Sequence, residues 1–380
     1  MKKILFISHD AHLAGAQVLL LNLLKWIKEV HPELKFDILL AGEGILTSEF
    51  KKNATVLKVP EIKQKANLFE RSIYNYKLNF FLKKIRNGNY DLIYNNTFSN
   101  GNLLSNLKVD NLPVITHVHE LDYWIKRNGA ENQKKIIATT DFYLTASKSV
   151  TNYLLENHIC TETNVETVYE WIDSNLLLHK NSKNSIKELL NLSDDSFIIA
   201  ASGRENFRKG KDWFIPIALG VLNKLKVKNI HFIWIGGHNS EELRYDCIKS
   251  GFENNIHFIE HIANANSYFN EFEIFLMLSR EDPFPLVNLE AAIWNVPIVC
   301  FEKAGGTEEL IEDNCGIKVP YGDLNMFSDA IIKLIENNEQ RKEIGNNIRK
   351  KVLKEYDINR VGEKIVEVVL KVIEKRNEKY

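Results

Sequence analysis

The stretch Ser279-Arg-Glu-Asp-Pro-Phe-Pro-Leu-Val-Asn-Leu-Glu-Ala-Ala292 carries the clearest structural signal in this sequence. It follows the apolar run Ile274–Leu278, which is typical of a buried strand. Pro283 and Pro285 disfavour helix before that point, so a helix is predicted to begin near Leu286. A strand, a rigid turn and a helix in this order form the repeating unit of an α/β domain.

Short apolar runs of this kind recur along the chain and fall into two sets, with helix-length amphipathic stretches between them. Most are continuously apolar, as expected of parallel strands that helices cover on both faces. The first set is Ile4–Ser8, Phe36–Ala41, Thr55–Val59, Asp91–Tyr94, Val114–Val118, Phe142–Ala146 and Val165–Tyr169. The second set is Phe197–Ser202, His231–Ile235, Ile256–Ile259, Ile274–Leu278, Pro297–Phe301 and Gly316–Val319.

A polar stretch rich in Asn and Ser, Asp173–Ser196, separates the two sets and marks the expected domain junction. We therefore predict an α/β protein with two doubly wound parallel-sheet domains, 1–175 and 176–355, followed by a closing helix over 356–380. That helix is predicted from an apolar stripe at Val361, Ile365, Val368, Val369 and Ile373. Such domains bind ligands at the carboxyl ends of their strands.

Composition narrows the class of function. The net charge of −1 over 380 residues gives no sign of a polyanionic partner, so no nucleic-acid binding is expected. The four cysteines are scattered, which fits a reducing compartment. The apolar start is too short for a signal peptide, and no run approaches the roughly 18 apolar residues that span a bilayer. A soluble cytoplasmic protein is expected.

The turn after Leu278 has the features of a phosphate and sugar site. A helix that begins near Leu286 aims the amides of Leu286 and Val287 at the crevice, where they attract phosphate. Asp282 lies in the turn and Glu290 lies one turn into the helix, so one carboxylate can meet sugar hydroxyls and the other ribose hydroxyls. The alternative is that the two acids only stabilise the start of the helix.

A second stretch, Ser202-Gly-Arg-Glu-Asn-Phe-Arg-Lys-Gly210, places cations directly after the first strand of the second set. Arg204 and Lys209 would stabilise a departing diphosphate, which gains negative charge in the transition state. Arg208 is adjacent and can be confused with Lys209. The alternative is a pair of solvated surface cations.

Together the two stretches resemble glycosyltransferase family 4, which has the GT-B fold of two Rossmann-like domains. The spacing of Asp282 and Glu290 is similar to the Glu-x7-Glu signature of that family, with Asp where Glu is commonest. Arg204 and Lys209 match the pair that holds the donor diphosphate. Pro285 replaces a frequent Gly, so one backbone amide that the family usually offers to the sugar is missing. Asp282 is one methylene shorter than Glu, which leaves sugar selectivity open.

The resemblance extends to other loops. Trp234-Ile-Gly-Gly237 is similar to a glycine-ended strand of the donor domain, and Thr116-His-Val-His-Glu-Leu121 places His119 where the family has a His that reaches the sugar. The alternative for Trp234–Gly237 is an ordinary tight turn, and the alternative for His119 is a structural histidine at the end of a strand. The catalytic candidates are His119, Asp282, Arg204 and Lys209. The donor-binding candidates are Gly15, Arg204, Lys209, Gly236, Asp282, Phe284, Leu286, Val287 and Glu290.

The resemblance implies a retaining transfer of a hexose-type sugar from a UDP- or GDP-linked donor to a glycan or lipid-linked acceptor, in envelope polysaccharide synthesis. It implies no metal, and the sequence shows no acidic or His-rich motif for one. No cofactor is expected beyond the nucleotide-sugar co-substrate. Two alternatives stay open: a nucleotide-sugar epimerase of the same fold, and a catalytically silent sugar-nucleotide-binding scaffold.

The acceptor side carries little motif, and Pro60–Leu78 and Tyr123–Gln133 are interpreted as loops. Lys77–Arg86 is either an ordinary packed helix with a solvated face or a basic amphipathic surface that touches anionic lipid. The second interpretation would put the protein at the inner membrane surface as a peripheral protein.

Overall fold

The computed structural model describes residues 1–60, 65, 67–107, 112–179, 185–204, 206–225, 229–238, 241–260, 262, 265–312 and 314–378. The chain forms two compact units: Met1–Tyr169 with Ile358–Tyr380 (unit 1), and Glu170–Asp357 (unit 2). The sequence-based boundaries were 175/176 and 355/356. Part of the polar stretch at the expected junction, residues 180–184, lies outside the described residues.

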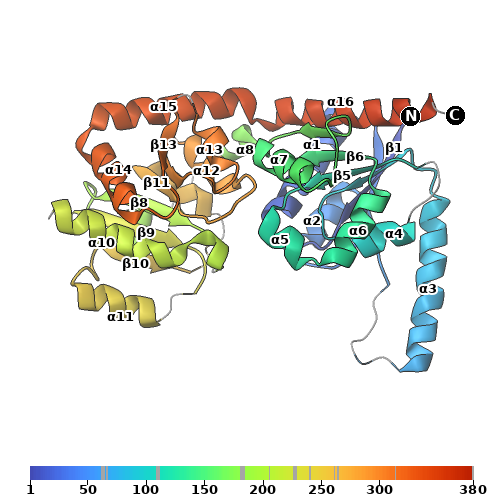
Figure 1. Ribbon diagram of the computed structural model, residues 1–380, viewed down its shortest axis with the longest axis horizontal. Coiled ribbons are helices and arrows are strands. Elements are labelled where there is room, and N and C mark those ends of the chain that lie inside the picture. Colours follow the sequence, from blue (N-terminus) through green and yellow to red (C-terminus); the bar gives the residue numbers. More distant parts are fainter. Residues whose placement is uncertain are drawn as a thin grey trace. The chain divides into compact units, whose positions relative to one another are not determined.

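Unit 1 contains a seven-stranded parallel sheet in the order β3-β2-β1-β4-β5-β6-β7 (Figure 1). Its strands are β1 (Lys3–Ser8), β2 (Lys35–Leu40), β3 (Thr55–Lys58), β4 (Leu92–Asn95), β5 (Val114–Val118), β6 (Phe142–Thr145) and β7 (Val165–Thr167). Its helices are α1 (Gly15–Val30), α2 (Thr47–Asn53), α3 (Leu68–Arg86), α4 (Gly101–Leu107), α5 (Asp122–Arg127), α6 (Ala130–Thr139), α7 (Lys148–Glu156) and α16 (Ile358–Asn377).

Unit 2 contains a six-stranded parallel sheet in the order β10-β9-β8-β11-β12-β13. Its strands are β8 (Phe197–Ser202), β9 (Ile230–Ile235), β10 (Ile256–Ile259), β11 (Ile274–Met277), β12 (Ile298–Phe301) and β13 (Gly316–Val319). Its α-helices are α8 (Ser174–His179), α9 (Ile186–Leu189), α10 (Phe214–Leu225), α11 (Glu241–Ser250), α12 (Leu286–Ala292), α13 (Thr307–Leu310), α14 (Leu324–Glu336) and α15 (Asn338–Glu355). The described residues of unit 2 also form the 3₁₀ turns η1 (Phe207–Lys209), η2 (Lys211–Trp213) and η3 (Ala265–Glu271).

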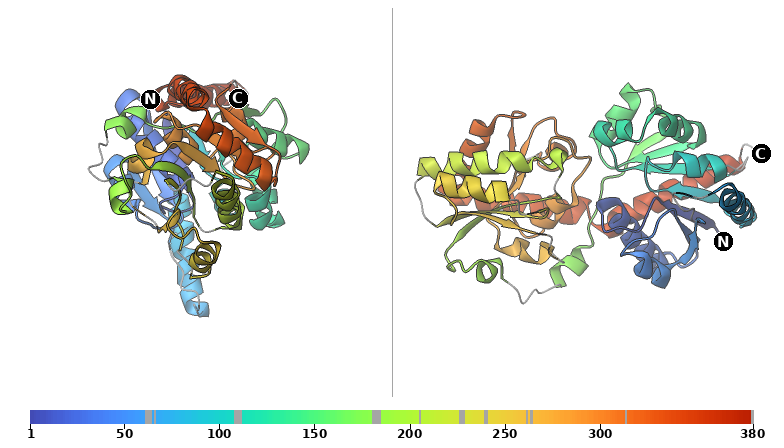
Figure 2. Two further views of the ribbon diagram at one scale, coloured as in Figure 1. Left: turned by 90° about the vertical axis from the view of Figure 1, so that its left-hand side faces the viewer. Right: turned by 90° about the horizontal axis from the view of Figure 1, so that it is seen from below.

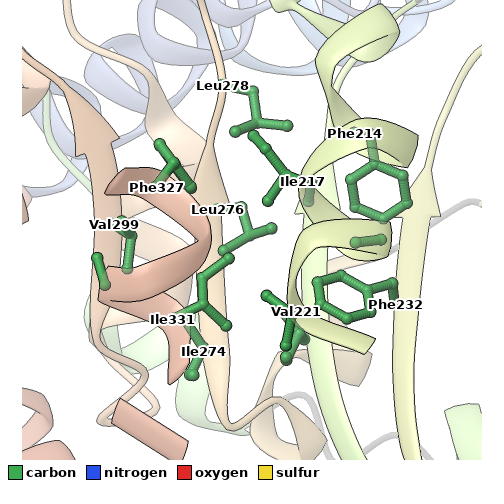
Figure 3. Packing of buried hydrophobic residues seen from close by; sticks show 14 of the residues in the cluster. Phe214, Ile217, Val221, Phe232, Ile274, Leu276, Leu278, Val299, Phe327 and Ile331 are labelled. Atoms are coloured by element: carbon green, nitrogen blue, oxygen red, sulfur yellow. The ribbon is translucent and has the colours of Figure 1, made fainter. Parts of the chain in front are cut away.

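Every strand predicted from an apolar run is confirmed, and no predicted end differs from the observed one by more than two residues. The strands could be recognised as apolar runs because helices bury both faces of each sheet. In unit 2, Leu276 and Val299 pack against α10 and α14, which contribute Phe214, Val221 and Ile331 (Figure 3). All five side chains are at most 1% exposed, so these strands form only where helices cover them.

The strand order in each sheet reverses direction at one place. In unit 1 the reversal lies between β1 and β4, and in unit 2 it lies between β8 and β11. Parallel sheets generally bind ligands at the carboxyl edge beside such a reversal, because the loops on its two sides lead off in opposite directions. The loops after β8 and β11 are the two that the sequence singled out.

The closing helix is confirmed as α16, and it packs within unit 1. The Trp26 indole of α1 donates to Asn359 Oδ1 at 3.0 Å. A Cβ at Gly362 would lie 2.7 Å from the Trp26 ring, so α16 approaches α1 at a residue that has no side chain. The predicted stripe from Val361 to Ile373 is buried.

Two segments interpreted as loops are helical. Residues 68–78 belong to α3, whose start is fixed by a capping box between Asn67 and Glu70, and α5 and α6 occupy most of Tyr123–Gln133. The described residues of the first segment exclude 61–64 and 66. Within the part of the chain that the structure covers, no helix is long and apolar enough to cross a bilayer.

Candidate functional site

The two loops at the reversal point of unit 2 meet through a buried ion pair. Lys209 ends η1, after β8, and its Nζ lies 2.5 Å from Asp282 Oδ2 in the loop after β11. Arg208 Nη1 lies 3.0 Å from the same oxygen. The carboxyl side chain is 8% exposed, against 17% for Lys209 and 14% for Arg208. The sequence predicted that Lys209 and Asp282 both follow strands of the second domain. In the structure the two side chains are in contact.

Burial and charge act against each other in this cluster. Burial opposes ionisation of Asp282, but the charges and hydrogen bonds of Arg208 and Lys209 outweigh it and hold its pKa below the usual range. Burial lowers the pKa of the Lys209 ammonium, and the charge of Asp282 opposes that shift. We therefore treat Asp282 as a carboxylate at neutral pH, flanked by two cations.

One oxygen of Asp282 takes all of these contacts. Ser279 Oγ donates to Oδ2 at 3.3 Å, as do Lys209 and Arg208 at shorter distances. Among the described residues, Oδ1 accepts no side-chain hydrogen bond. The carboxylate can therefore hold the cations with one oxygen and offer the other to a ligand.

Glycines let the backbone pack closely around the ion pair. The Lys209 stem lies against Gly203, where an added Cβ would meet Lys209 Cγ at 3.2 Å. Gly236 has φ +109°, and its Cβ would lie 2.6 Å from the Gly203 carbonyl oxygen. The Trp234 indole donates to the carbonyls of Gly203 and Gly236 at 3.2 and 2.9 Å. Gly236 therefore lies at the edge of the cluster as a backbone element.

The loop after β12 holds the backbone of Asp282. The Asp282 amide donates to the Ala304 carbonyl at 2.7 Å, and the Gly306 amide donates to the Asp282 carbonyl at 3.1 Å. Gly305 has φ +113°, and a Cβ there would lie 2.0 Å from the Asp282 carbonyl oxygen. Only glycine fits this position.

The predicted start of α12 is confirmed at Leu286, after an extended Pro285 at φ −73° and ψ 122°. No side chain caps the first turn. Leu286, Val287 and Glu290 are half-buried. Phe284 is buried and stacks on Tyr356, with ring centroids 5.4 Å apart, so a donor contact from this residue is left to its backbone.

Sequence reasoning missed the part that Arg208 and Arg280 play. Arg204 is exposed after Gly203, and it is Arg208 that joins Lys209 on Asp282. Arg280 lies over the rings of Phe207 and Trp213, 4.0 and 3.9 Å from the centroids. It also donates two hydrogen bonds to the carboxylate of Asp212, which fixes η2 to the loop after β11. The adjacency of Arg208 to Lys209 was the only sequence signal.

In unit 1 the candidates lie along the carboxyl ends of β1, β4 and β5. α1 begins at Gly15, and the next residue, Ala16, accepts a hydrogen bond from Asn96 Nδ2 at 2.8 Å. The Oδ1 atom of the same Asn96 side chain lies 3.2 Å from His119 Nε2. The acid after His119, Glu120, accepts from the amide of Phe98 at 3.1 Å and from the Thr97 hydroxyl. Asn96 thus links the Gly15 loop to half-buried His119.

A second histidine, His117, lies at the same strand end and is fully buried. Its Nδ1 atom forms a hydrogen bond of 2.6 Å with the Tyr94 hydroxyl. Burial and the neighbouring charge of His119 lower its pKa well below the ordinary value. His117 is therefore a neutral residue of the unit 1 core.

This burial predicts a pH dependence of stability. Below about pH 6.5 the unfolded chain protonates His117 while the folded chain does not, so the free energy of unfolding falls as pH drops. Between about pH 7.5 and pH 5.5 the loss from this group is about 1.4 kcal/mol. Urea unfolding of His117→Gln should show a correspondingly smaller pH effect, whereas exposed His158→Asn should behave as wild type. An unchanged pH effect in His117→Gln would contradict this.

Within the described residues, no group of three or more His, Cys, Asp or Glu side chains is arranged to hold a metal ion. The absence of a metal requirement remains a prediction.

Comparison with known proteins adds a family model described as "Glycosyl transferases group 1", which matches residues 182–351. A curated relative, the capsular polysaccharide biosynthesis glycosyltransferase CapM of Staphylococcus aureus, is 25% identical over 176 residues, 46% of either chain. The poly(ribitol-phosphate) alpha-N-acetylglucosaminyltransferase of Staphylococcus aureus is 23% identical over 154 residues, 40% of this chain and 31% of that protein. These matches span less than half the length of both relatives.

Solved structures match over nearly the whole chain. Anabaena Alr3699/HepE in complex with UDP-glucose has a TM-score of 0.78 at 18% identity, covering 98% of this chain and 100% of that one. WaaG, a glycosyltransferase involved in lipopolysaccharide biosynthesis, has a TM-score of 0.71 at 13% identity, covering 96% and 99%. The fold is therefore GT-B, as predicted. Residues 182–351 and the aligned parts of the curated relatives are therefore similar to glycosyltransferases of group 1.

Proposed function

We propose that this protein is a retaining glycosyltransferase of the family 4 type. It transfers a hexose-type sugar from a UDP- or GDP-linked donor to a glycan or lipid-linked acceptor in cell-envelope polysaccharide synthesis, on the cytoplasmic side. The names of CapM and of the poly(ribitol-phosphate) transferase support the polysaccharide class, and the UDP-glucose complex of HepE supports the donor class.

One observation carries the proposal: Lys209 and Arg208 converge on Asp282 at the reversal point of the unit 2 sheet. In the reaction the bond between the sugar C1 and the diphosphate oxygen breaks, and negative charge grows on the diphosphate. Cations that are already fixed and partly buried stabilise that charge without reorganising. A role in stability alone does not explain this cluster well. The cost of removing the charges from water offsets their mutual attraction, so a buried ion pair adds little to the free energy of unfolding.

Each candidate then has a role. Lys209, Arg208 and the amides of Leu286 and Val287 bind the diphosphate, with Arg204 at the rim. Asp282 uses Oδ2 to orient the cations and Oδ1 to accept from a sugar hydroxyl, and Glu290 accepts from the ribose. The backbone of Gly236 and of Phe284 lines the donor. Gly15 and His119 of unit 1 are assigned from the family resemblance. The acceptor oxygen bonds to C1 on the same face, and its proton passes to the departing diphosphate.

The direct test of the function is a ligand panel. A nucleoside diphosphate present at about 100 times its Kd should stabilise the protein by about 2.7 kcal/mol. Thermal shifts with UDP, GDP and ADP and their sugars would identify the base. Slow hydrolysis of the preferred donor should follow, because water can replace the acceptor. Conversion of the donor to an isomeric sugar would indicate an epimerase, and binding without turnover would indicate a scaffold.

Two variants test the site. Arg204→Ala should lower donor turnover about 10- to 100-fold if its guanidinium contacts the diphosphate, since a charged hydrogen bond contributes about 1.5–3 kcal/mol. Glu290→Ala should raise the KM for the donor through loss of the ribose contact. The matched controls are Arg244→Ala and Glu242→Ala on α11 of the same unit, which should match wild type. Near wild-type turnover in both site variants would remove this assignment.

A further inference from the structure

Helix α3 carries a second apolar face that unit 1 does not cover. Its inner face packs into the unit 1 core through buried Leu82 and Ile85 and partly buried Leu78 and Phe81. The opposite side exposes Phe69, Ile73, Tyr76 and Phe80, at 73%, 39%, 75% and 67% exposure. We call these four residues the outer stripe.

The spacing of the outer stripe makes it one continuous surface. Its members follow one another at intervals of four, three and four residues, which places them within a narrow arc of an α-helix at about 100° per residue. At the same rotation per residue, the residues of the inner face lie on roughly the opposite side of the helix from the outer stripe. Figures 1 and 2 show the amino-terminal part of α3, where most of the stripe lies, extending away from the sheet of unit 1.

The charge of α3 differs from that of the whole chain. The helix contains five cations (Arg71, Lys77, Lys83, Lys84 and Arg86) and one acid (Glu70), a net +4, whereas the chain as a whole carries −1. Lys77, Lys83 and Lys84 border the outer stripe and are exposed, and none of them has an acidic partner among the described residues. The uncovered apolar face is thus bordered by cations.

We propose that the outer stripe of α3 docks on an anionic lipid surface. Aromatic side chains favour the boundary between headgroups and acyl chains, and a helix with a mixed aromatic and aliphatic face lies in that plane. Flanking lysines reach anionic headgroups while their stems cover apolar surface. The helix cannot bury this face within its own unit, because its inner face already occupies that position.

A second copy of the chain fits the same stripe less well. Pairing two outer stripes would bring Lys77, Lys83 and Lys84 of both copies together. The one acid of the helix, Glu70, accepts from the Asn67 amide at the helix start and is not on the stripe. The charge pattern therefore favours an anionic surface over self-association. The proposal does not depend on the transfer reaction, because binding to lipid needs no donor.

The test is sedimentation of the full chain with phosphatidylcholine vesicles, with and without phosphatidylglycerol. Binding should be at least about 100-fold stronger to the anionic vesicles, because each of the three lysines near such a surface contributes about fivefold. Lys77→Gln/Lys83→Gln/Lys84→Gln should weaken it about 100-fold, and Tyr76→Ser/Phe80→Ser should weaken it through loss of inserted apolar surface.

Matched controls exist in unit 2, where the same chemical changes fall on other exposed surfaces. Lys342→Gln/Lys350→Gln/Lys354→Gln on α15 removes the same charge, and Tyr245→Ser/Ile248→Ser on α11 removes exposed apolar surface. Both should bind vesicles as wild type does, and all variants should melt as wild type. Failure to bind anionic vesicles, or equal losses in the α3 and control variants, would overturn the proposal. So would a dimer in vesicle-free solution that Tyr76→Ser/Phe80→Ser abolishes.

Discussion

Lys209→Met should lower donor kcat/KM by about 100- to 1,000-fold, the effect of removing one fixed group that stabilises transition-state charge. Methionine keeps the stem that packs against Gly203 and removes only the ammonium. Arg208 remains on Asp282 and limits the cost to the fold. Turnover should therefore fall much more than stability.

The matched control for this loss is Lys224→Met on α10, an exposed lysine that pairs with Asp329 at 2.6 Å. It makes the same chemical change at the surface of the same unit and should turn over the donor as wild type does. Donor hydrolysis and thermal unfolding measured side by side separate the two effects. Turnover of Lys209→Met within a few-fold of wild type would show that the ammonium does not serve the diphosphate.

Gly305→Ala should lower the free energy of unfolding of unit 2 by about 3 to 5 kcal/mol, from backbone strain and overpacking together. The residue has φ +113°, and the added methyl would lie 2.0 Å from the Asp282 carbonyl oxygen. Relief requires the loop after β11 to move, and Asp282 moves with it. Donor turnover should therefore fall even below the unfolding transition.

Gly322→Ala separates the two causes of that destabilisation. Gly322 also has positive φ, +79°, but nothing lies within 4 Å of its added Cβ. It should lose only the backbone term, about 1–2 kcal/mol, and keep its activity. The difference between the two urea midpoints then measures the steric term. Equal midpoints would mean that the loop after β12 does not hold Asp282 as tightly as the structure indicates.

The sheets could be predicted from sequence because parallel strands buried on both faces appear as unbroken apolar runs. The strands at Ile274–Leu278 and Phe197–Ser202 could be predicted without knowledge of the tertiary structure. α3 could not be predicted in full, because its outer stripe adds apolar residues on a second side and obscures the single-face pattern of a packed helix. Its start depends on the Asn67–Glu70 capping box, a local signal present in the sequence.

The sequence predicted which loops form the site, but not which side-chain atoms make contact within it. The strand order brings the loops after β8 and β11 together, which follows from parallel topology. Which cation reaches Asp282 depends on the η1 turn and on left-handed Gly210, at φ +69°, and sequence does not give those directions. The ring of Phe284 turns toward Tyr356, a residue far along the chain, and no local pattern predicts that contact.

The most direct test of the central claim is a crystal structure of this chain soaked with uridine diphosphate. We expect diphosphate oxygens within hydrogen-bond distance of Lys209 Nζ and of the amides at the start of α12, with Asp282 still bound to the ammonium. A diphosphate bound elsewhere on the molecule, with Lys209 turned away from it, would contradict the account.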